Sequence, residues 1–320
     1  MALPRSQPNF LAGPYLNRLT HLRKSAADLR SALDDAATVF VPVWQSRNLI
    51  APVGEAPEAR FVSGAATLRT LAADDFILLG QFHDHVYFAV AVPGEASPSL
   101  DVPGEFHDLR TIAGQLPREE AGLLAYARAM VSWRERHRYC GRCGARTVAL
   151  QGGHVLQCTN TSCNTQQFPR IDPAIIVLVT EGERCLLGRQ AEWPAGRYST
   201  IAGFVEPGES LEDAVAREVH EETGIVVDGV DYHSSQPWPF PSSLMLGFMA
   251  HAASTQIQRT DEELEDALWV TREQIAAGEV ALPTTHSISF RLIEDWYDAA
   301  ADVPLREAPR ARLWTAPPRR

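Results

Sequence analysis

Short apolar runs separated by polar turns dominate residues 1–135 of the chain. The run Thr38–Trp44 predicts a strand, and the stretch FILLGQFHDHVYFAVAV from Phe76 predicts two strands joined by a polar turn. Helices are expected near Ala26–Asp34 and between Pro117 and His137, where a proline start, two early glutamates and an apolar stripe occur together. Residues 1–135 therefore predict a small α+β domain.

A second pattern begins after residue 168. The nearly all-apolar run Ala174–Thr180 is followed across a turn by Arg184–Gly188, which predicts a hairpin in a buried sheet. A helix is expected from about Ser210 to Gly224, and glycine suits its C-terminal cap. Its apolar stripe consists of Leu211, Ala214, Val215 and Val219. We expect one domain over residues 169–303 and a loosely ordered, Ala/Pro/Arg-rich tail over residues 304–320.

Composition narrows the class of protein. A chain of 320 residues with 45% hydrophobic content is long enough for two or three compact units. The formal net charge of −11 argues against a generally basic nucleic-acid or membrane-surface binder. The first residues lack the basic region and apolar core of a signal peptide, and no run approaches about 18 apolar residues. We therefore expect a cytoplasmic protein with no membrane partner.

Four of the five cysteines lie in one short segment. The spacing Cys140-x2-Cys143 followed by Cys158-x4-Cys163 is that of a zinc ribbon, in which four thiolates hold one tetrahedral zinc ion. Such a closed site is structural, so we predict a zinc ribbon over residues 136–168. Ordinary buried cysteines are the alternative. Contact of the ribbon with nucleic acid stays open because five arginines lie nearby: Arg134, Arg136, Arg138, Arg142 and Arg146.

Three glutamates share one face of the helix expected after Ser210. At about 100° per residue, Glu218, Glu221 and Glu222 fall within an arc of roughly 100°. Like charges at this spacing destabilise an isolated helix, whereas Mg²⁺ and Mn²⁺ need a cluster of oxygen ligands. A solvated acidic face is the alternative, but the apolar stripe opposite would hold the acidic face in place. The helix therefore predicts a divalent-metal site.

The same segment carries a longer motif. It reads Gly203-x5-Glu209-x7-Arg217-Glu218-Val219-x-Glu221-Glu222-x-Gly224-Ile225 and resembles the signature of the Nudix hydrolase superfamily at every fixed position. The resemblance implies an α/β fold, an α/β/α sandwich with a mixed sheet, preceded here by the zinc ribbon and the α+β N-terminal domain. It also implies a hydrolase that cleaves a diphosphate linkage with the help of about two or three Mg²⁺ or Mn²⁺ ions, which neutralise the phosphates and activate a water molecule.

The resemblance also implies residue roles. Glu218 and Glu222 are the expected metal ligands, and Glu221 is a ligand or a partner of metal-bound water. Glu209 and Arg217 are expected to form an orienting ion pair, and one of the glutamates is expected to act as the general base. The backbone carbonyl of Ala202, just before the motif, is a further expected ligand.

Downstream, residues 235–243 read SQPWPFPSS and resemble the SQPWPFPxS array of the NADH pyrophosphatase branch of this superfamily. The prolines stiffen the backbone and the aromatics present flat surfaces, which suits a nucleotide ring. The ribbon, Phe168-Pro169-Arg170 and Arg291-Leu292-Ile293-Glu294 agree with that branch. The resemblance implies a homodimer that cleaves NADH or NAD to nicotinamide mononucleotide and AMP, and it extends to removal of a NAD cap from RNA 5′ ends.

Substrate contacts follow from the same branch. They are Arg110, Phe168, Gln236, Pro237, Trp238, Pro239, Phe240, Pro241, Ser242, Ser243 and Ser289. Phe204 is expected either to stack on nicotinamide or to pack in the core. Glu263, six residues before Trp269, is expected to be an extra metal ligand, with a solvated acidic loop as the alternative.

The ribbon departs from some members of the branch. Gly153 stands where a glutamate contact can occur, and the second cysteine pair is spaced x4 and not x2. Two other functions stay open. A Nudix hydrolase of other nucleoside diphosphates, such as ADP-ribose, is opposed by the SQPWPFPSS array. A zinc-ribbon nucleic-acid-binding module is opposed by the intact glutamates.

Overall fold

The computed structural model describes residues 6, 8–13, 15–52, 54, 56–64, 68, 75–259 and 263–314. They fall into two compact units. The N-terminal unit consists of Gly13–Ile171 with Trp238–Ser242. The C-terminal unit consists of Asp172–Pro237 and Ser243–Arg320, with the described residues of Met1–Ala12. The expected zinc ribbon thus shares a unit with the residues that precede it.

The N-terminal unit is built on a seven-stranded sheet with the order β1-β5-β6-β2-β3-β7, in which β4 pairs with β2. The strands are β1 (Leu16–Asn17), β2 (Val39–Trp44), β3 (Arg47–Ile50), β4 (Val62–Ser63), β5 (Phe76–Phe82), β6 (His85–Ala91) and β7 (Glu105–His107). Strands β2 and β6 are parallel, and β5 and β6 form the hairpin predicted from the sequence. The helical segments are η1 (Leu22–Lys24), α1 (Ala26–Asp34), α3 (Leu109–Ile112) and η2 (Ala113–Gln115).

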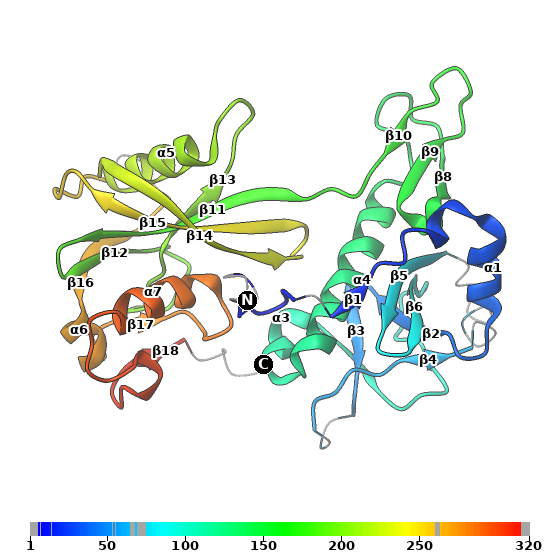
Figure 1. The fold of residues 1–320 in the computed structure, drawn as a ribbon, viewed down its shortest axis with the longest axis horizontal. Helices are drawn as coiled ribbons and strands as arrows, with labels where there is room; N and C mark the ends of the chain where they lie inside the picture. Colours follow the sequence, from blue (N-terminus) through cyan, green and yellow to red (C-terminus); the bar gives the residue numbers. More distant parts are fainter. Residues whose placement is uncertain are drawn as a thin grey trace. The chain divides into compact units, whose positions relative to one another are not determined.

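Helix α4 (Arg118–Arg136) packs along this sheet and leads into the ribbon (Figure 1). Leu123, Leu124 and Val131 are buried on its packed face, as the apolar stripe predicts. The ribbon consists of β8 (Thr147–Leu150), η3 (Gln151–Gly153), β9 (Val155–Cys158) and β10 (Gln166–Gln167), paired in the order β10-β9-β8.

The C-terminal unit contains a mixed sheet with the order β14-β15-β11-β12-β16, and β13 pairs with β11. The strands of this sheet are β11 (Asp172–Glu181), β12 (Arg184–Arg189), β13 (Ile201–Phe204), β14 (Val227–Trp238), β15 (Ser243–Ala252) and β16 (Asp266–Thr271). A separate two-stranded sheet consists of β17 (Ala281–Leu282) and β18 (Arg312–Leu313). The helical segments are α5 (Leu211–Thr223), α6 (Arg272–Ala277), α7 (Ile288–Asp298) and η4 (Leu305–Glu307). Strands β11 and β15 pair in parallel, whereas β11 pairs antiparallel with β12 and β13, and β12 with β16.

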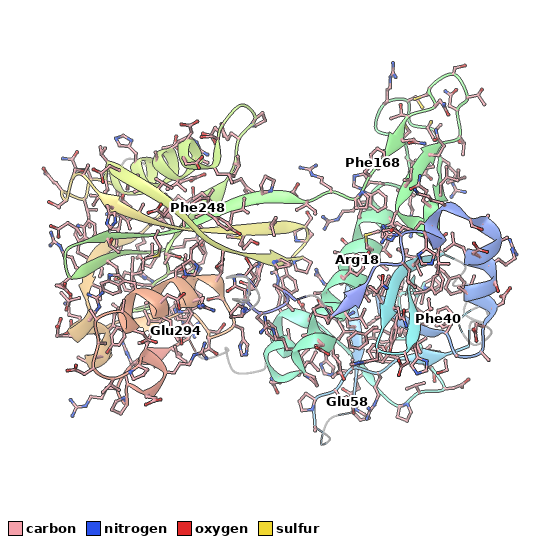
Figure 2. All side chains as sticks on the ribbon, in the orientation of Figure 1. Arg18, Phe40, Glu58, Phe168, Phe248 and Glu294 are labelled. Atoms are coloured by element: carbon pink, nitrogen blue, oxygen red, sulfur yellow. The ribbon has the colours of Figure 1, made fainter. Side chains whose placement is uncertain are left out.

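The central strand β11 is apolar on both faces because each face is covered. Ile175 and Val177 pack in the core that includes α5, and Ile176 and Leu178 pack in the core that includes α7. Figure 1 shows these two helices on opposite sides of the sheet, and Figure 2 labels Phe248 of β15, which belongs to the α5 core. The expected α/β/α sandwich with a mixed sheet is confirmed.

The described part of the tail differs from the loosely ordered segment that we expected. Leu305 in η4 is 3% exposed, and β18 pairs in parallel with β17. Residues 304–314 are ordered because Leu305 is buried and the backbone of β18 is paired. Residues 315–320 lie outside the described residues. Among the helices of the described ranges, none combines the length and the apolar character needed to cross a membrane.

Candidate active site and zinc site

Helix α5 begins and ends where the sequence predicts. The Ser210 hydroxyl accepts a hydrogen bond from the amide of Asp213 at 3.1 Å, and the Asp213 carboxylate accepts one from the amide of Ser210 at 3.2 Å. At the other end Gly224 adopts a left-handed conformation with φ of 70°, which favours glycine. These two caps fix the length of the helix that carries the glutamates.

The packing of α5 decides which glutamates are buried. Three residues of the predicted apolar stripe are 0% exposed and pack in the core against the sheet. Glu218 and Glu222, four residues apart, are only 8% and 3% exposed, whereas the side chain of Glu221 is 52% exposed. A solvated acidic face is therefore excluded for Glu218 and Glu222, and Glu221 alone faces solvent among the three.

Arg217 connects the carboxylates of the motif. Its guanidinium donates to Glu209 Oε1 at 2.5 Å and Oε2 at 3.0 Å, so the predicted ion pair is present. It also donates to Glu218 Oε1 and Glu221 Oε2, each at 2.9 Å, and to the carbonyl of Phe204 at 2.9 Å. One side chain thus orients three carboxylates and the end of β13.

Charge and burial shift two pKa values in opposite directions. The Arg217 guanidinium lowers the pKa of Glu209 to about 2, so this carboxylate stays ionised at neutral pH. Burial raises the pKa of Glu218 despite the opposing effect of Arg217, and the negative charges of Glu221 and Glu263 raise it further. A divalent cation beside Glu218 would favour its ionised form.

The close approach of Gly203 to Glu218 explains the first glycine of the motif. A Cβ at Gly203 would lie 1.9 Å from Glu218 Cδ and 2.0 and 2.2 Å from its two oxygens. Pairing of β13 with β11 sets Ala202 opposite Ile176 and so holds this stretch of backbone in place. Only glycine leaves room for the buried carboxylate, and the expected carbonyl ligand, Ala202, lies one residue before it.

Gly203→Ala is expected to displace the Glu218 carboxylate and to lower kcat/KM by about 100-fold, the order of loss that a misplacement of about 1 Å can cause. Steady-state hydrolysis and thermal unfolding measure the two effects separately. Gly141→Ala is the control, since a Cβ there meets nothing within 4 Å. Unchanged activity in Gly203→Ala would show that the position of Glu218 does not matter.

The negative charge of Glu263 acts on Glu218 of the α5 helix. Glu263 is exposed and follows residues 260–262, which lie outside the described residues. Its charge contributes to the raised pKa of Glu218, so the acidic loop acts on the same site. Its role as an extra metal ligand stays a prediction.

Gln236, a predicted substrate contact, is used inside the protein. It is 1% exposed, and its amide nitrogen donates to the carbonyls of Phe10 at 3.0 Å and His286 at 2.8 Å. Its amide oxygen accepts from the backbone of Ile288 at 2.8 Å. These three bonds anchor the start of α7, so the observed side chain has a structural role.

Ser289, another predicted substrate contact, is also buried and hydrogen-bonded inside the protein. It is 3% exposed, and its hydroxyl accepts from the amide of Thr200 at 3.2 Å and from the Thr200 hydroxyl at 2.9 Å. A further bond of 2.9 Å joins it to the Ser199 hydroxyl. Since a hydroxyl has one donor and two acceptor positions, its capacity is filled, and Ser289 holds the segment that enters β13. Its predicted substrate contact would require this network to open.

Two arginines hold the centre of the SQPWPFPSS array within the N-terminal unit. Arg110 donates to the Phe240 carbonyl at 2.9 Å, and its Cζ lies 5.0 Å from the centre of the Phe240 ring. Arg128 donates to the carbonyls of Ser46, at 2.8 Å, and Pro239, and its Cζ lies 4.8 Å from the same ring. Phe240 is 7% exposed, so its ring anchors the loop by cation–π contacts.

Sequence reasoning missed Arg128, since nothing in the pattern of α4 distinguishes it from a surface arginine. Arg128→Ala is expected to raise KM about tenfold with little change in kcat, because the loss of two charge-assisted hydrogen bonds loosens the loop. Arg128→Lys should be intermediate, since lysine keeps the charge but lacks the planar fork. Kinetics with varied substrate test this, and a fall in kcat alone would contradict a role in loop position.

The other predicted substrate residues vary in exposure. Phe168, labelled in Figure 2, is 62% exposed and Phe204 is 59% exposed, so core packing is excluded for Phe204. Within the array, Pro239 is buried and Pro241 is exposed, and four residues are half-buried: Pro237, Trp238, Ser242 and Ser243. Their contacts with substrate stay predictions.

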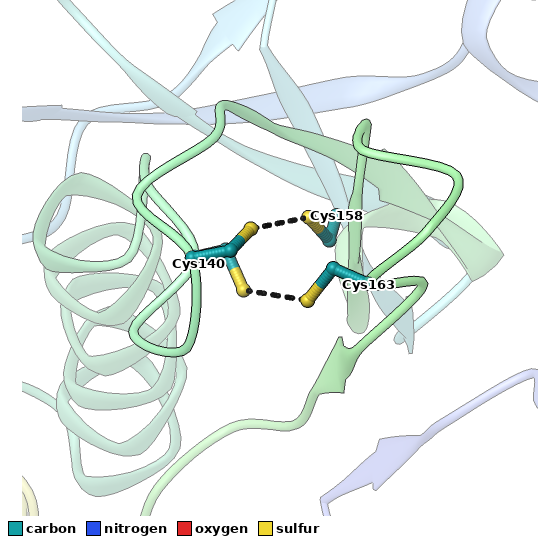
Figure 3. Close-up of side chains that lie close together, drawn as sticks. Cys140, Cys158 and Cys163 are labelled. Atoms are coloured by element: carbon teal, nitrogen blue, oxygen red, sulfur yellow. Dashed lines mark hydrogen bonds between the residues drawn. The ribbon is translucent and has the colours of Figure 1, made fainter.

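The four ribbon cysteines converge as predicted (Figure 3). Their sulfur atoms all lie within 4.8 Å of one another, with Cys140 Sγ 3.8 Å from Cys163 Sγ and Cys143 Sγ 3.4 Å from Cys158 Sγ. A tetrahedral zinc ion with Zn–S bonds of about 2.3 Å needs sulfurs about 3.8 Å apart, so the donor set fits zinc. The thiols are not joined as disulfides.

Comparisons with known proteins agree with this architecture. A NUDIX domain model matches residues 170–295, and a model of the NADH pyrophosphatase zinc ribbon domain matches residues 135–168. A third model, the NADH pyrophosphatase-like rudimentary NUDIX domain, matches residues 37–133 within the N-terminal unit.

Three relatives cover different shares of the chain. NAD-capped RNA hydrolase NUDT12 from Macaca fascicularis is 43% identical to this chain, and the match covers 57% of this chain and 43% of the length of NUDT12. NAD-capped RNA hydrolase NudC from Stutzerimonas stutzeri is 44% identical over 62% of this chain and 71% of its own length. NAD-capped RNA hydrolase from Schizosaccharomyces pombe is 34% identical over 85% of this chain and 86% of its own length. The chain thus spans less than half the length of the NUDT12 relatives.

The sandwich and its capped glutamate helix are those of the Nudix superfamily. With a zinc ribbon and a rudimentary NUDIX domain placed before that sandwich, the chain belongs to the NADH pyrophosphatase branch of the Nudix hydrolase family.

Proposed function

We propose that the protein hydrolyses the pyrophosphate bond of NADH or NAD and releases nicotinamide mononucleotide and AMP. The observation that carries this proposal is the pair of buried glutamates, Glu218 and Glu222, on a helix with an intact Nudix motif, with Glu218 lying against Gly203. The array from Gln236 to Ser243 and the match to an NADH pyrophosphatase zinc ribbon direct this chemistry toward a dinucleotide.

The oxygen donors around Gly203 suit Mg²⁺ or Mn²⁺. In this proposal Glu218, Glu222 and the Ala202 carbonyl hold about two or three ions per site, with Glu221 and Glu263 as further ligands. When bound, such ions neutralise the diphosphate and lower the pKa of the water molecule that attacks phosphorus.

The protein's own side chains prepare the site for that reaction. Arg217 holds Glu209, Glu218 and Glu221 in one arrangement before substrate arrives. One of the glutamates on α5 accepts the proton from the attacking water. The exposed rings of Phe168 and Phe204 offer flat surfaces on which a nicotinamide or adenine ring can stack.

Removal of a NAD cap from RNA is a second candidate function. The three relatives reported above are each named NAD-capped RNA hydrolases. The bond to be cleaved in the cap is the same pyrophosphate bond as in free NAD. A single active site can therefore serve both substrates, provided that the RNA after the cap has a place to bind.

A panel of substrates tests the proposal. The protein is incubated with Mg²⁺ or Mn²⁺ and, separately, with NADH, NAD, ADP-ribose or NAD-capped RNA, and the products are separated by chromatography. NADH and NAD are expected to be cleaved at least about tenfold more efficiently than ADP-ribose, within the range that a specific pocket provides. Cleavage of ADP-ribose alone would favour a hydrolase of other nucleoside diphosphates. Turnover of none of them would favour the nucleic-acid-binding alternative.

A homodimer and a cytoplasmic location belong to the same proposal, on the basis of the branch resemblance. Light scattering of the purified protein measures the first, and fractionation of cells that express it measures the second. A monomer at micromolar concentration would contradict the homodimer.

A further inference from the structure

Two hollows lined by cations lie on the N-terminal unit. The first, of about 700 Å³, lies among η1, α1, the start of β5 and the η3 turn. The second, of about 840 Å³, lies among the end of α4, β8 and β9. Figure 1 shows α1, the end of α4 and β8 in the same part of this unit. Asp75, Arg134 and Ala149 line both hollows, so the two adjoin. We call them together the ribbon groove.

The ribbon groove is basic although the chain as a whole is acidic. Its cations are Arg23, Lys24, Arg30, Arg134, Arg138 and Arg146, whereas its acidic lining residues, within the described ranges, are Asp75 and Glu135. The formal net charge of the whole chain is −11. A local excess of positive charge on an acidic protein marks a surface for a polyanion, because random placement of charge would make this surface negative.

Arg23 and Arg134 lack partners for part of their guanidinium groups. Arg134 pairs with Asp75 at 2.7 Å through Nη2, and its side chain is 10% exposed. Its Nη1 and the Nε of Arg23 are buried with no hydrogen-bond partner in the described part of the protein. Buried donors without acceptors are costly, and phosphate oxygens are strong acceptors for guanidinium groups. These two atoms lie below the surface, so the donors that can face a phosphate are those of the exposed groove cations Lys24, Arg30, Arg138 and Arg146.

Apolar and aromatic side chains stand among these cations. Val148 and Leu150 on β8 are 47% and 43% exposed, and each lines one of the two hollows. Tyr139 is 57% exposed, and the Cζ of Arg146 lies 6.0 Å from the centre of its ring. Exposed flat or apolar surfaces between cations suit single-stranded nucleic acid, whose unstacked bases need surfaces on which to pack.

We propose that the ribbon groove binds the single-stranded RNA that follows a NAD cap. This inference rests on the proposed function for its substrate, because free NAD has no phosphodiester chain to occupy the groove. The cations contact RNA phosphates, and Val148, Leu150 and Tyr139 contact bases. Binding here raises the efficiency of cap removal and leaves hydrolysis of the free dinucleotide unchanged.

Direct binding is measured first, with no cleavage involved. A 5′-labelled single-stranded RNA without a cap is titrated with zinc-loaded protein, and fluorescence anisotropy gives Kd over a range of salt concentrations. The variant Lys24→Gln/Arg30→Gln/Arg138→Gln removes three exposed groove cations and leaves the Arg134–Asp75 pair intact. The slope of log Kd against log salt is expected to fall by about 2, at about 0.7 for each lost phosphate contact.

Catalysis then distinguishes the groove from the active site. The same variant is expected to lose about tenfold in kcat/KM with NAD-capped RNA and to keep its kcat/KM with free NAD. The matched control, Arg18→Gln/Arg47→Gln/Arg118→Gln, removes three exposed arginines of the same unit that line neither hollow. It should keep both activities and its affinity for RNA.

Several results would overturn the inference. Equal loss with both substrates would mean that the three residues act through the fold. Equal loss in the control would mean a general charge effect, and an unchanged Kd and salt slope would mean that the groove does not bind RNA. Displacement of RNA by an acidic peptide at equal concentration would mean a groove for acidic proteins. If wild-type protein cleaves neither substrate, the proposed function fails, while the anisotropy experiment still decides the groove.

Discussion

Glu222→Gln is expected to lower kcat/KM for NADH by about 10²- to 10⁴-fold without loss of the fold, the range for removal of a positioned catalytic carboxylate. Glu222 is 3% exposed on the face of α5 that carries Glu218. Glutamine has the same shape, so the packing of the helix is preserved, but the negative charge that would hold a cation is lost. Steady-state kinetics with NADH at saturating Mn²⁺ measure the effect.

The control for Glu222→Gln is Glu212→Gln. Glu212 lies in the first turn of the same helix and is exposed. Glu212→Gln therefore removes one negative charge, as Glu222→Gln does, without altering the buried pair Glu218 and Glu222. It is expected to keep activity within about twofold, since surface substitutions away from such features have small effects. Full activity in Glu222→Gln, with an unchanged melting temperature, would contradict the assignment of the metal site.

Cys143→Ser is expected to release zinc and to unfold the ribbon. Zinc binding to such small sites contributes about 10–16 kcal/mol near neutral pH, which a short segment with few buried apolar residues cannot replace. Wild-type protein should contain one zinc ion per chain by elemental analysis, and the variant none. Limited proteolysis should cut the variant within residues 136–168 while the C-terminal unit stays resistant.

The matched control is the fifth cysteine. Cys185 on β12 is 0% exposed in the core of the C-terminal unit, and burial raises the pKa of its thiol to about 12, so it has no part in the zinc site. Cys185→Ala should keep its zinc and keep the ribbon intact. An equal zinc content in wild-type and Cys143→Ser protein would show that the four cysteines do not hold the ion together.

Local features made much of this fold predictable. The limits of α5 follow from Ser210 and Gly224, whose side-chain and backbone preferences act on the nearest turn. The hairpin of β5 and β6 and the two helices α1 and α4 follow from the spacing of apolar residues. The cysteine cluster follows from a spacing that few other structures share.

Features that depend on distant parts of the chain were not predictable from the pattern. The sequence placed three glutamates on one face, but only packing against the sheet shows that Glu218 and Glu222 are buried and Glu221 is exposed. Gln236 and Arg128 acquire their roles from carbonyl groups far away in the sequence. No local preference marks such contacts, because they form only when the units have folded.

The most direct test of the central claim identifies which bond of NAD is broken. Wild-type protein is incubated with NAD and Mg²⁺, and the products are quantified by liquid chromatography with mass detection. Cleavage of the pyrophosphate bond should yield nicotinamide mononucleotide and AMP in equal amounts, and neither product should appear with Glu222→Gln. Release of nicotinamide with ADP-ribose, or NAD left intact by a zinc-loaded protein, would contradict the account.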